Sequence, residues 1–406
     1  MADGGGPAVL KVAARLAAVD AADWDACAAG SCGGDDNPFV AHAFLSALED
    51  SGSAEADTGW LPQHLLVEDD HGRLLGCAPM YLKGHSYGEY VFDHAWADAY
   101  ERAGGRYYPK LQLAVPFTPV TGPRFLVRDG VDQDAVIDAL AGGVAQVAAQ
   151  HKIATAHMTF PREAEWQRLG AAGWLQRTGQ QYHWVNQDFA TFDDFLGALN
   201  SRKRKAIKKE RRAVVDAGIT MRVLTGDDLK PDHWDAFFRF YTSTSDRKWG
   251  VPYLTRAFFD QIGQTMADRI ALVIAEDDGV PVAGALNLIG GSALYGRNWG
   301  CDGHYKFLHF EACYYQAIEF AITRGLKTVE AGAQGQHKIQ RGYLPTRTYS
   351  AHLIRDPHFQ EAVARFLKQE TDQVDWQIEA LGQYSPFRRS DNDPPRAVCA
   401  EDLFDE

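Results

Sequence analysis

Two stretches decide the fold: LLVEDDHGRLLGCAPMYL at residues 65–82 and LVIAEDDGVPVAGALNLI at residues 272–289. Each stretch places an apolar run on both sides of an acidic turn that contains glycine. Apolar runs that flank such a turn are typical of a β-hairpin. Because the same pattern occurs once in each half of the chain, the sequence predicts an internal repeat.

The similarity between the two halves continues downstream in the same order. After each hairpin we expect a strand, a long helix, a strand, a Gly-aromatic pair and a last strand. These elements are residues 90–92, 134–150, 154–160, Gly173-Trp174 and 182–185 in the first half, and 293–297, 308–324, 327–333, Gly342-Tyr343 and 349–354 in the second. This order predicts an α/β (α+β) protein in which each half is a mixed sheet with a helix packed on it.

The repeat also predicts the domain organisation. We expect an N-terminal domain at residues 1–186 and a C-terminal domain at residues 187–385. Residues 386–406 are rich in Asp, Pro and Arg, which predicts a mobile acidic tail.

Composition places the chain among ordinary globular proteins. Apolar residues make up 46% of the 406 residues and charged residues 23%. The net charge of −13 excludes a protein whose whole surface binds nucleic acid or anionic membranes, so any basic patch must be local. The six cysteines are spread widely and form no CxxC pair, which favours reduced thiols.

The sequence carries no signal for export or membrane insertion. Lys11 and Arg15 interrupt the apolar N-terminal stretch, which is not the pattern of a signal peptide. No apolar run approaches the roughly 20 residues that a spanning helix needs. We therefore expect a cytoplasmic protein without a transmembrane segment.

A strongly basic helix is predicted at residues 192–216, after a capping box formed by Thr191 and Asp194. Between residues 202 and 212 it carries eight basic side chains, opposed only by Glu210. Such asymmetry in an acidic protein indicates phosphate binding, and we name Arg204, Lys208 and Arg211 as the anionic donor-binding residues. A solvated face offset by nearby acids is the alternative.

The segment EAGAQGQHKIQRGY at residues 330–343 is the predicted functional site. It begins on a strand and leaves the sheet through three glycines, which allow sharp turns and close approach to a ligand. Glu330 is a candidate general base and His337 a candidate proton shuttle. The other candidates in this segment are substrate-binding residues: Gln334, Gln336, Lys338, Arg341 and Tyr343. A solvated surface loop is the alternative.

Two neighbouring elements supply further candidates. The nearly all-apolar helix at residues 307–322 carries Glu311 as a third catalytic candidate, and His309 and Gln316 as substrate-binding residues. Capping by the helix dipole is the alternative role for Glu311. The strand at residues 294–302 places Tyr295, Arg297 and Trp299 at alternate positions, which predicts that all three line one sheet face.

No metal site is expected. The histidines near the predicted site, together with Glu311, show no HExxH or comparable paired spacing.

These residues resemble a known family. LHFEACYYQAIEFAI, followed by EAGAQGQHKIQRGYLPTRTYSAH, is similar to the bacterial Fem-AB-like family of N-acyltransferases, often labelled peptidoglycan biosynthesis or recognition proteins. The resemblance covers most of the chain, including NSRKRKAIKKERR and LYGRNWGCD. It implies tandem GNAT-like domains, which agrees with the repeat found from the residues.

The resemblance also implies an activity. Fem peptidyltransferases use aminoacyl-tRNA as acyl donor and a peptidoglycan precursor as acceptor. The segment before the main helix, GCDGHYKFLHFE, departs from the Gln/Arg-x-x-Gly-x-Gly/Ala loop with which GNAT acetyltransferases bind acetyl-CoA. The donor, aminoacyl-tRNA or acyl-CoA, is therefore left open, and no permanently bound cofactor is expected.

We accordingly expect an N-acyltransferase that acts on an amine acceptor such as a peptidoglycan precursor. Its active site lies in the second half, and the first half, which lacks the glycine-and-amide loop, is expected to be a degenerate domain. The alternative is a non-catalytic binding protein that recognises RNA or a cell-wall fragment.

Overall fold

The computed structural model describes residues 8–248 and 252–388, so residues 389–406 of the predicted tail lie outside the described residues. The chain divides into two compact units. Among the described residues, the first comprises 8–179, 253–265 and 348–372, and the second comprises 180–248, 252, 266–347 and 373–388. This division is more interleaved than the single boundary predicted at residue 186.

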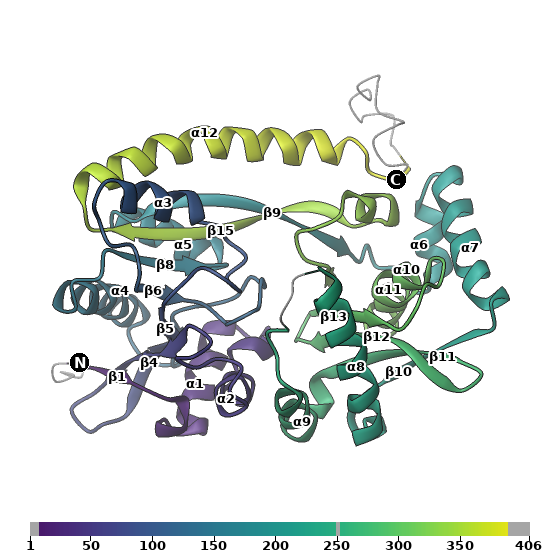
Figure 1. Cartoon of the computed structure of the whole chain (residues 1–406), viewed down its shortest axis with the longest axis horizontal. Coiled ribbons are helices and arrows are strands. Elements are labelled where there is room, and N and C mark those ends of the chain that lie inside the picture. Colours follow the sequence, from purple (N-terminus) through teal and green to yellow (C-terminus); the bar gives the residue numbers. More distant parts are fainter. Residues whose placement is uncertain (1–7, 249–251, 389–406) are drawn as a thin grey trace. The chain divides into compact units, whose positions relative to one another are not determined.

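The first unit contains a four-stranded sheet in the order β1-β3-β4-β7 and five further strands in the order β15-β8-β6-β5-β2 (Figure 1). Its strands are β1 (Val9–Ala13), β2 (Trp60–Pro62), β3 (His64–Glu68), β4 (Leu74–Ala78), β5 (Met80–Lys83), β6 (Lys110–Leu113), β7 (Leu126–Val127), β8 (Thr155–Thr159) and the end of β15 (Leu344–Ile354). Its helices are α1 (Ala21–Cys32), α2 (His42–Asp50), α3 (His94–Arg102), α4 (Gln133–Gln150), α5 (Glu163–Ala171), α9 (Arg256–Thr265) and the start of α12 (Pro357–Gly382), with 3-10 turns at Leu16–Ala18 and Pro38–Val40.

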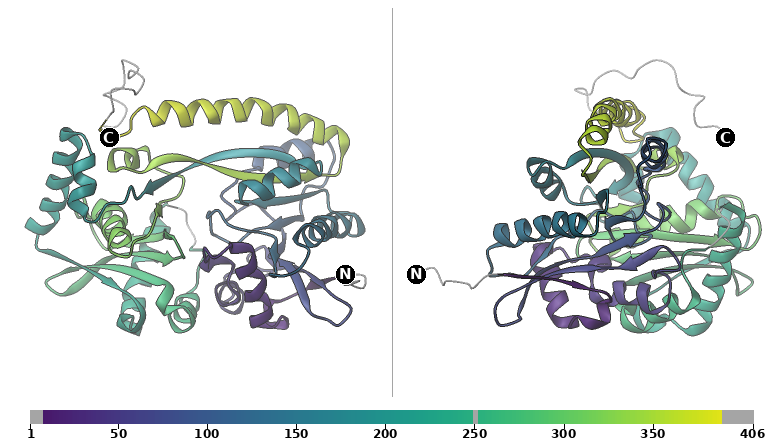
Figure 2. Two further views of the ribbon diagram at one scale, coloured as in Figure 1. Left: turned by 180° about the vertical axis from the view of Figure 1, so that it is seen from behind. Right: turned by 60° about the vertical axis from the view of Figure 1, so that its left-hand side comes forward.

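Helix α4 shows how the sequence builds this unit. Asp132 caps the helix by accepting a hydrogen bond from the amide of Ala135. Val136, Leu140 and Val144 recur every four residues and are buried, so one face of the helix packs against β3, β4 and β8 (Figures 1 and 2). The predicted helix at residues 134–150 is confirmed.

The first predicted hairpin is confirmed, because β3 and β4 pair antiparallel with Leu65 opposite Ala78. The strand predicted at residues 90–92 is wrong. That segment is irregular, and Tyr90 adopts a positive φ of 60°, which no strand residue does. The third strand of the repeat is instead β6, which pairs antiparallel with β5 and parallel with β8.

The second unit repeats this arrangement in strands ordered β10-β11-β12-β13-β14-β9. Its strands are β10 (Ile219–Leu224), β11 (Ile270–Asp277), β12 (Val280–Ile289), β13 (Ala293–Cys301), β14 (Thr328–Glu330), the end of β9 (Leu175–Val185) and the start of β15. Its helices are α6 (Phe192–Ala198), α7 (Ser201–Asp216), α8 (Pro231–Lys248), α10 (Leu308–Phe310), a π-helical turn (Glu311–Tyr315), α11 (Gln316–Thr323) and the end of α12, with 3-10 turns at Gly226–Asp228, Ala267–Arg269 and Gln336–Arg341.

The second crossover has the predicted order. β11 and β12 pair antiparallel, β12 and β13 do the same, and β13 pairs parallel with β14 after the helical segment from Leu308 to Thr323. Tyr315, Ile318 and Ile322 of this segment lie in the main core of the unit. Parallel strands require such a crossover, which explains why each half contains one long helix between strands.

The predicted basic helix is two helices rather than one. The predicted capping box is present, because Thr191 accepts from the amide of Asp194 and the Asp194 carboxylate accepts from the amide of Thr191. The chain then becomes extended at Leu199, and Asn200 caps α7 by accepting from the amide of Lys203. An asparagine side chain competes for backbone N–H groups, which favours a new helix start over a continuous helix.

The last strands of the two halves are exchanged. β9 from the first half pairs with β14 inside the second unit, with His183 opposite Glu330. β15 from the second half pairs with β8 inside the first unit, with His352 opposite His157. Each unit therefore receives the final strand of its sheet from the other half of the chain.

Within residues 8–248 and 252–388, no helix combines the length and the apolar character that crossing a bilayer requires.

Candidate active site

The predicted functional segment is a loop that begins at the end of β14. Gly332, Gly335 and Gly342 all have positive φ angles, of 73°, 96° and 93°. A Cβ atom at Gly335 would approach the His337 ring to 2.4 Å, so a larger residue would displace that ring. Between the last two glycines the chain forms the 3-10 turn Gln336–Arg341.

Lys338 holds the loop against the end of β14. Its ammonium group is buried and donates hydrogen bonds to the carbonyl oxygens of Ala331 and, at 3.2 Å, Gly332. Burial lowers the pKa of Lys338 to about 8, because a charged amine loses hydration in the interior. The side chain therefore places a positive charge, mostly retained at pH 7, beneath the loop.

Arg341 is also buried, and each nitrogen of its guanidinium group has a partner. Nε donates to the hydroxyl of Tyr315 at 3.0 Å, Nη1 to the carbonyl oxygen of His337 at 2.8 Å, and Nη2 to Glu210 of α7 at 2.8 Å. The guanidinium carbon lies 3.4 Å from the centre of the Phe310 ring. This planar group thus links α7, the π-helical turn and the loop through hydrogen bonds.

His337 lies beside the π-helical turn. Its Nε2 is 3.0 Å from the hydroxyl of Tyr314, and its ring centre is 6.1 Å from that of His309. Burial raises the pKa of Tyr314 well above its ordinary value, so this hydroxyl keeps its proton. The hydrogen bond therefore orients the imidazole ring of His337.

Glu330 is the last residue of β14, and its carboxylate lies 3.7 Å from Nε2 of His183 on the neighbouring strand β9. Burial, together with the positive charge of Lys338, lowers the pKa of His183 to about 4. His183 is therefore neutral at pH 7.

Glu311 is held by hydrogen bonds from two neighbouring side chains. Its buried carboxylate accepts from Arg211 of α7 through Nε at 3.2 Å and Nη2 at 3.0 Å, and from Gln316 at 2.8 Å. Arg211 also binds Glu319 at 2.7 Å. Glu311 opens the π-helical turn, a feature found frequently at functional sites.

Strand β13 contains a bulge that overturns the prediction of one shared face. Leu286 pairs with Asn298 and Asn287 pairs with Gly296, so Arg297 is an extra residue. Tyr295 pairs with Leu288 and Trp299 pairs with Ala285. These partners are three positions apart on β12, so Tyr295 and Trp299 point to opposite faces.

Beyond the bulge, β13 and β14 separate. Their parallel pairing covers only Ala293–Tyr295 and Thr328–Glu330, whereas β13 stays paired with β12 as far as Cys301. The loop with Lys338 and His337 begins at this point of divergence. A strand end that opens onto a polar loop is a suitable place for a ligand to reach backbone groups.

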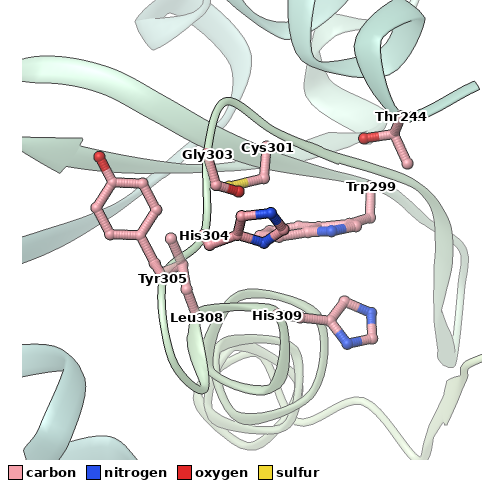
Figure 3. Close-up of a pocket in the computed structure, with 8 residues that line it drawn as sticks. All are labelled: Thr244, Trp299, Cys301, Gly303, His304, Tyr305, Leu308 and His309. Atoms are coloured by element: carbon pink, nitrogen blue, oxygen red, sulfur yellow. The ribbon is translucent and has the colours of Figure 1, made fainter. Parts of the chain in front are cut away.

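A pocket of about 280 Å³ lies next to this region. It is lined by Thr244 of α8 and by residues of β13, the segment after it and the start of α10, namely Trp299, Cys301, Gly303, His304, Tyr305, Leu308 and His309 (Figure 3). The ring of His309 is 5.3 Å from Trp299 and 5.3 Å from Tyr314, so it joins the pocket wall to the side chains around His337. The lining is aromatic and carries no carboxylate.

The remaining predicted residues divide into three groups. Gln334 and Gln336 are exposed on the loop, which suits substrate contact. Tyr343 is fully buried and donates a hydrogen bond to the carbonyl oxygen of Tyr314, which is a core role. On α7, Lys208 is exposed and pairs with Asp193, whereas Arg211 turns inward to Glu311, so the three predicted anion-binding residues do not share one environment.

Sequence reasoning missed the partners that hold these groups. Glu210, Tyr314, Tyr315 and His183 contact the predicted residues directly. One signal for Glu210 was present in the sequence. It is the only acidic residue in the stretch 202–212, which carries eight basic residues. In the described ranges, no group of three or more His, Cys, Asp or Glu side chains is placed to hold a metal ion.

The sequence profile of the FemAB-like family, described as peptidoglycan biosynthesis/recognition, matches residues 15–389. The chain therefore belongs to the FemAB-like family of peptidoglycan biosynthesis or recognition proteins. No curated protein sequence matches the chain significantly.

Solved structures share the fold at low identity. FemX is 12% identical with a TM-score of 0.53, and the match covers 85% of this chain and 98% of FemX. The C-terminal domain of a protein from Agrobacterium fabrum, assigned as a lysylphosphatidylglycerol synthetase, is 10% identical with a TM-score of 0.52, covering 86% and 96%. A tandem GNAT protein from the clavulanic acid biosynthesis pathway is 11% identical with a TM-score of 0.48, covering 86% and 99%. FemX and the Agrobacterium fabrum domain share the fold of this chain, and the predicted α/β fold is confirmed.

Proposed function

We propose that this protein is an N-acyltransferase that transfers an acyl or aminoacyl group to an amine, and that a peptidoglycan precursor supplies the amine. The observation that carries the proposal is the divergence of β13 and β14. At that point Glu330 ends its strand and the loop holding His337 and Lys338 begins. A carbonyl group bound there would meet a carboxylate, an imidazole and a buried ammonium group.

The amine nucleophile must lose a proton during the reaction. We assign this proton to Glu330, because its carboxylate lies at the end of β14, where the loop of the candidate site begins. The amine nitrogen forms the new C–N bond, the ester or thioester bond of the donor breaks, and the leaving oxygen or sulfur takes up a proton. We assign the supply of that proton to His337, whose ring is hydrogen-bonded to Tyr314. Glu311 keeps a structural role, because Arg211 and Gln316 already bind it.

The developing negative charge on the donor carbonyl needs stabilisation. Lys338 supplies a fixed positive charge in a desolvated position, where it acts more strongly than in water. Its bonds to Ala331 and Gly332 also fix the loop backbone at the start of the site. Holding donor and acceptor together supplies much of the remaining rate acceleration.

Two donor classes fit the proposal, aminoacyl-tRNA and acyl-CoA. Both carry phosphate groups, for which the exposed basic residues of α7 provide a surface. The aromatic pocket with Trp299 and His309 would receive an uncharged part of the donor. Neither donor is a permanently bound cofactor.

The test is turnover by the purified protein. Aminoacyl-tRNAs and a panel of acyl-CoAs are each offered with amine-bearing peptides that resemble the stem of a peptidoglycan precursor, and the products are followed by mass spectrometry. The proposal expects formation of an amide with at least one pair. If no donor is consumed with any amine while RNA or a cell-wall fragment still binds, the non-catalytic binding protein is the better description.

A further inference from the structure

Helix α7 contacts the candidate site through residues on its inward face. Lys203 donates to Gln340 of the loop at 2.9 Å, Glu210 binds Arg341 at 2.8 Å, and Arg211 binds Glu311 at 3.0 Å. Ile207 and Val214 are buried on the same helix. The inward face is thus fixed both by apolar packing and by ion pairs of opposite polarity.

The position of Glu210 is unusual for an acid in a basic helix. An exposed glutamate would pair with basic neighbours one turn away. Glu210 instead has a side chain only 15% exposed, and it pairs with Arg341, which is 8% exposed. Its second oxygen accepts from the hydroxyl of Tyr315. A nearly buried pair of this kind is sensitive to loss of either partner.

Through Arg341, the carboxylate of Glu210 reaches the loop backbone. Arg341 uses Nη2 for Glu210 and Nη1 for the carbonyl oxygen of His337. The hydroxyl of Tyr315 donates to Glu210 and accepts from Arg341, so these three side chains form a closed ring of hydrogen bonds. Removal of Glu210 would leave the buried guanidinium without its counter-charge, and the main chain at His337 would lose a fixed partner.

The outward face of α7 has a different character. Lys205, Lys208, Lys209 and Arg212 are exposed, and those with charged partners pair with acids that are themselves exposed, as Arg212 does with Asp216. Exposed pairs contribute little and are easily exchanged for another anion. This face is therefore available to phosphates, whereas the inward face is committed to the site.

We propose that Glu210 is a positioning residue of the candidate active site, and that the two faces of α7 have separate tasks: the inward face sets the geometry of the loop at His337, and the outward face sets affinity for a polyanionic donor. This inference rests on the proposed function only for its kinetic half. The structural half, that Glu210 orders residues 336–341, holds for the free protein.

The kinetic test uses the donor and acceptor found to be active. Glu210→Ala lowers kcat by roughly 10- to 100-fold, as expected when a reacting group is displaced by about 1 Å, while KM for the donor stays within about two-fold. Glu210→Gln, which keeps an acceptor for Arg341 but not the charge, falls between Glu210→Ala and the wild type. Reversal of Lys205 and Lys209 to glutamate gives the opposite pattern, a raised KM that depends on salt with kcat retained.

The structural test needs no substrate. Hydrogen exchange of the amides in residues 336–342 is measured in the folded wild type, in Glu210→Ala and in Asp216→Ala, a matched carboxylate removal on the outward face. Faster exchange only in Glu210→Ala supports the inference. Tyr315→Phe, which removes the bridging hydroxyl, supplies a milder second variant if Glu210→Ala does not fold.

Equal exchange in the wild type, Glu210→Ala and Tyr315→Phe would overturn the positioning role, whatever the enzyme assay shows. A wild type that turns over no donor, combined with faster exchange in Glu210→Ala, would instead reject the proposed function and leave the positioning role standing.

Discussion

The two crossovers of the repeat differ in regularity. In the first unit, β6 pairs with both β5 and β8 without a register shift, and α4 is an uninterrupted helix. In the second unit, β13 carries a bulge at Arg297, the helix contains the π-helical turn, and the following strand ends after three residues in a glycine-rich loop. The same supersecondary unit is thus regular in the first unit and irregular in the second.

This difference shows where the chain departs from regular strand and helix geometry. A bulge and a π-helical turn interrupt the regular hydrogen bonding of a strand and a helix, and glycine loses more conformational entropy on folding than other residues. Here all three features lie around the start of one loop. The first crossover shows that the topology does not need them. They are therefore best explained by the chemistry proposed for the second unit.

The units also differ in what they bury. Beneath residues 84–93, the first unit buries Lys110 with Glu89 at 2.7 Å and Asp93 beside it, and Lys83 lies 4.0 Å from Glu89. The candidate site buries Lys338 against carbonyl oxygens instead of carboxylates. The first unit thus neutralises Lys110 with carboxylates, whereas the second pairs Lys338 with uncharged carbonyl oxygens.

The largest effect is expected from Glu330→Gln. Removing the proposed proton acceptor lowers kcat by roughly 100- to 10,000-fold while the fold is retained, because a general base of this type contributes that much. The measurement is steady-state turnover of the active donor. Glu163→Gln, an exposed carboxylate after β8 in the first crossover, is the matched control and leaves turnover unchanged. Equal activity of both variants would remove Glu330 from the mechanism.

Lys338→Met is expected to lower kcat/KM by about 100-fold, the cost of removing one stabiliser of transition-state charge. Because the positive charge is needed and the pKa of Lys338 is about 8, wild-type activity falls as pH rises through 8. The pH–rate profile of Lys338→Met lacks this fall in activity above pH 8. Lys152→Met, which removes an exposed lysine after α4, is the control and keeps the fall in activity above pH 8. A profile unchanged by Lys338→Met contradicts the assignment.

Deletion of Arg297 makes the second crossover resemble the first. It removes the extra residue without changing the partners on either side, so the sheet stays in register. We expect a folded protein with roughly 10-fold lower kcat/KM, because β13 and β14 no longer separate in the same way. Deletion of Gln112 in the regular strand β6 moves Leu113 to the other face of the sheet, and we expect it to destabilise the first unit, as urea unfolding followed by circular dichroism would show. Full activity after deletion of Arg297 would show that the bulge has no role.

The smallest effect concerns the first unit. Burial raises the pKa of Glu89 to about 7, so its contribution to stability is present below about pH 4.5 and is lost as pH rises to 7. Burial lowers the pKa of Lys83 to about 7, so its contribution is present above about pH 10.5 and is lost as pH falls to 7.

Glu89→Gln therefore flattens the decline of the urea midpoint between pH 5 and pH 7, relative to the wild type, and Lys83→Met flattens the rise above pH 7. Glu163→Gln, at an exposed site, keeps the wild-type slope. Parallel pH profiles for the wild type and both buried-site variants would show that the cluster does not titrate in this range.

Much of the fold could be predicted from the sequence because the signals were local. The hairpins follow from apolar runs around acidic turns, α4 from apolar spacing of four residues, and the start of α6 from the Thr191 capping box. The loop at residues 330–343 was found from its glycines and its mixed donors. All of these features are visible within a window of about a dozen residues.

The rest depends on pairing between distant segments. The bulge at Arg297 exists only relative to β12, and strict alternation therefore placed Tyr295 and Trp299 on one face in error. The ion pair of Glu210 with Arg341 joins residues far apart in the chain, and nothing near either residue specifies it. The exchange of β9 and β15 is of the same kind, because both strands look alike in sequence.

That exchange has a consequence for synthesis on the ribosome. The core of the first unit includes Ala351 of β15, and Val363 and Leu367 of α12 close a second cluster over Trp96. These residues are translated well after residue 186, so the N-terminal half must wait, with its sheet incomplete, until β15 and the start of α12 have been translated. At about 5–20 residues per second this delay lasts about 10 seconds or longer. A chain that stops at residue 186 would lack those contacts and would present an open strand edge at β8, which makes it a substrate for chaperones and proteases.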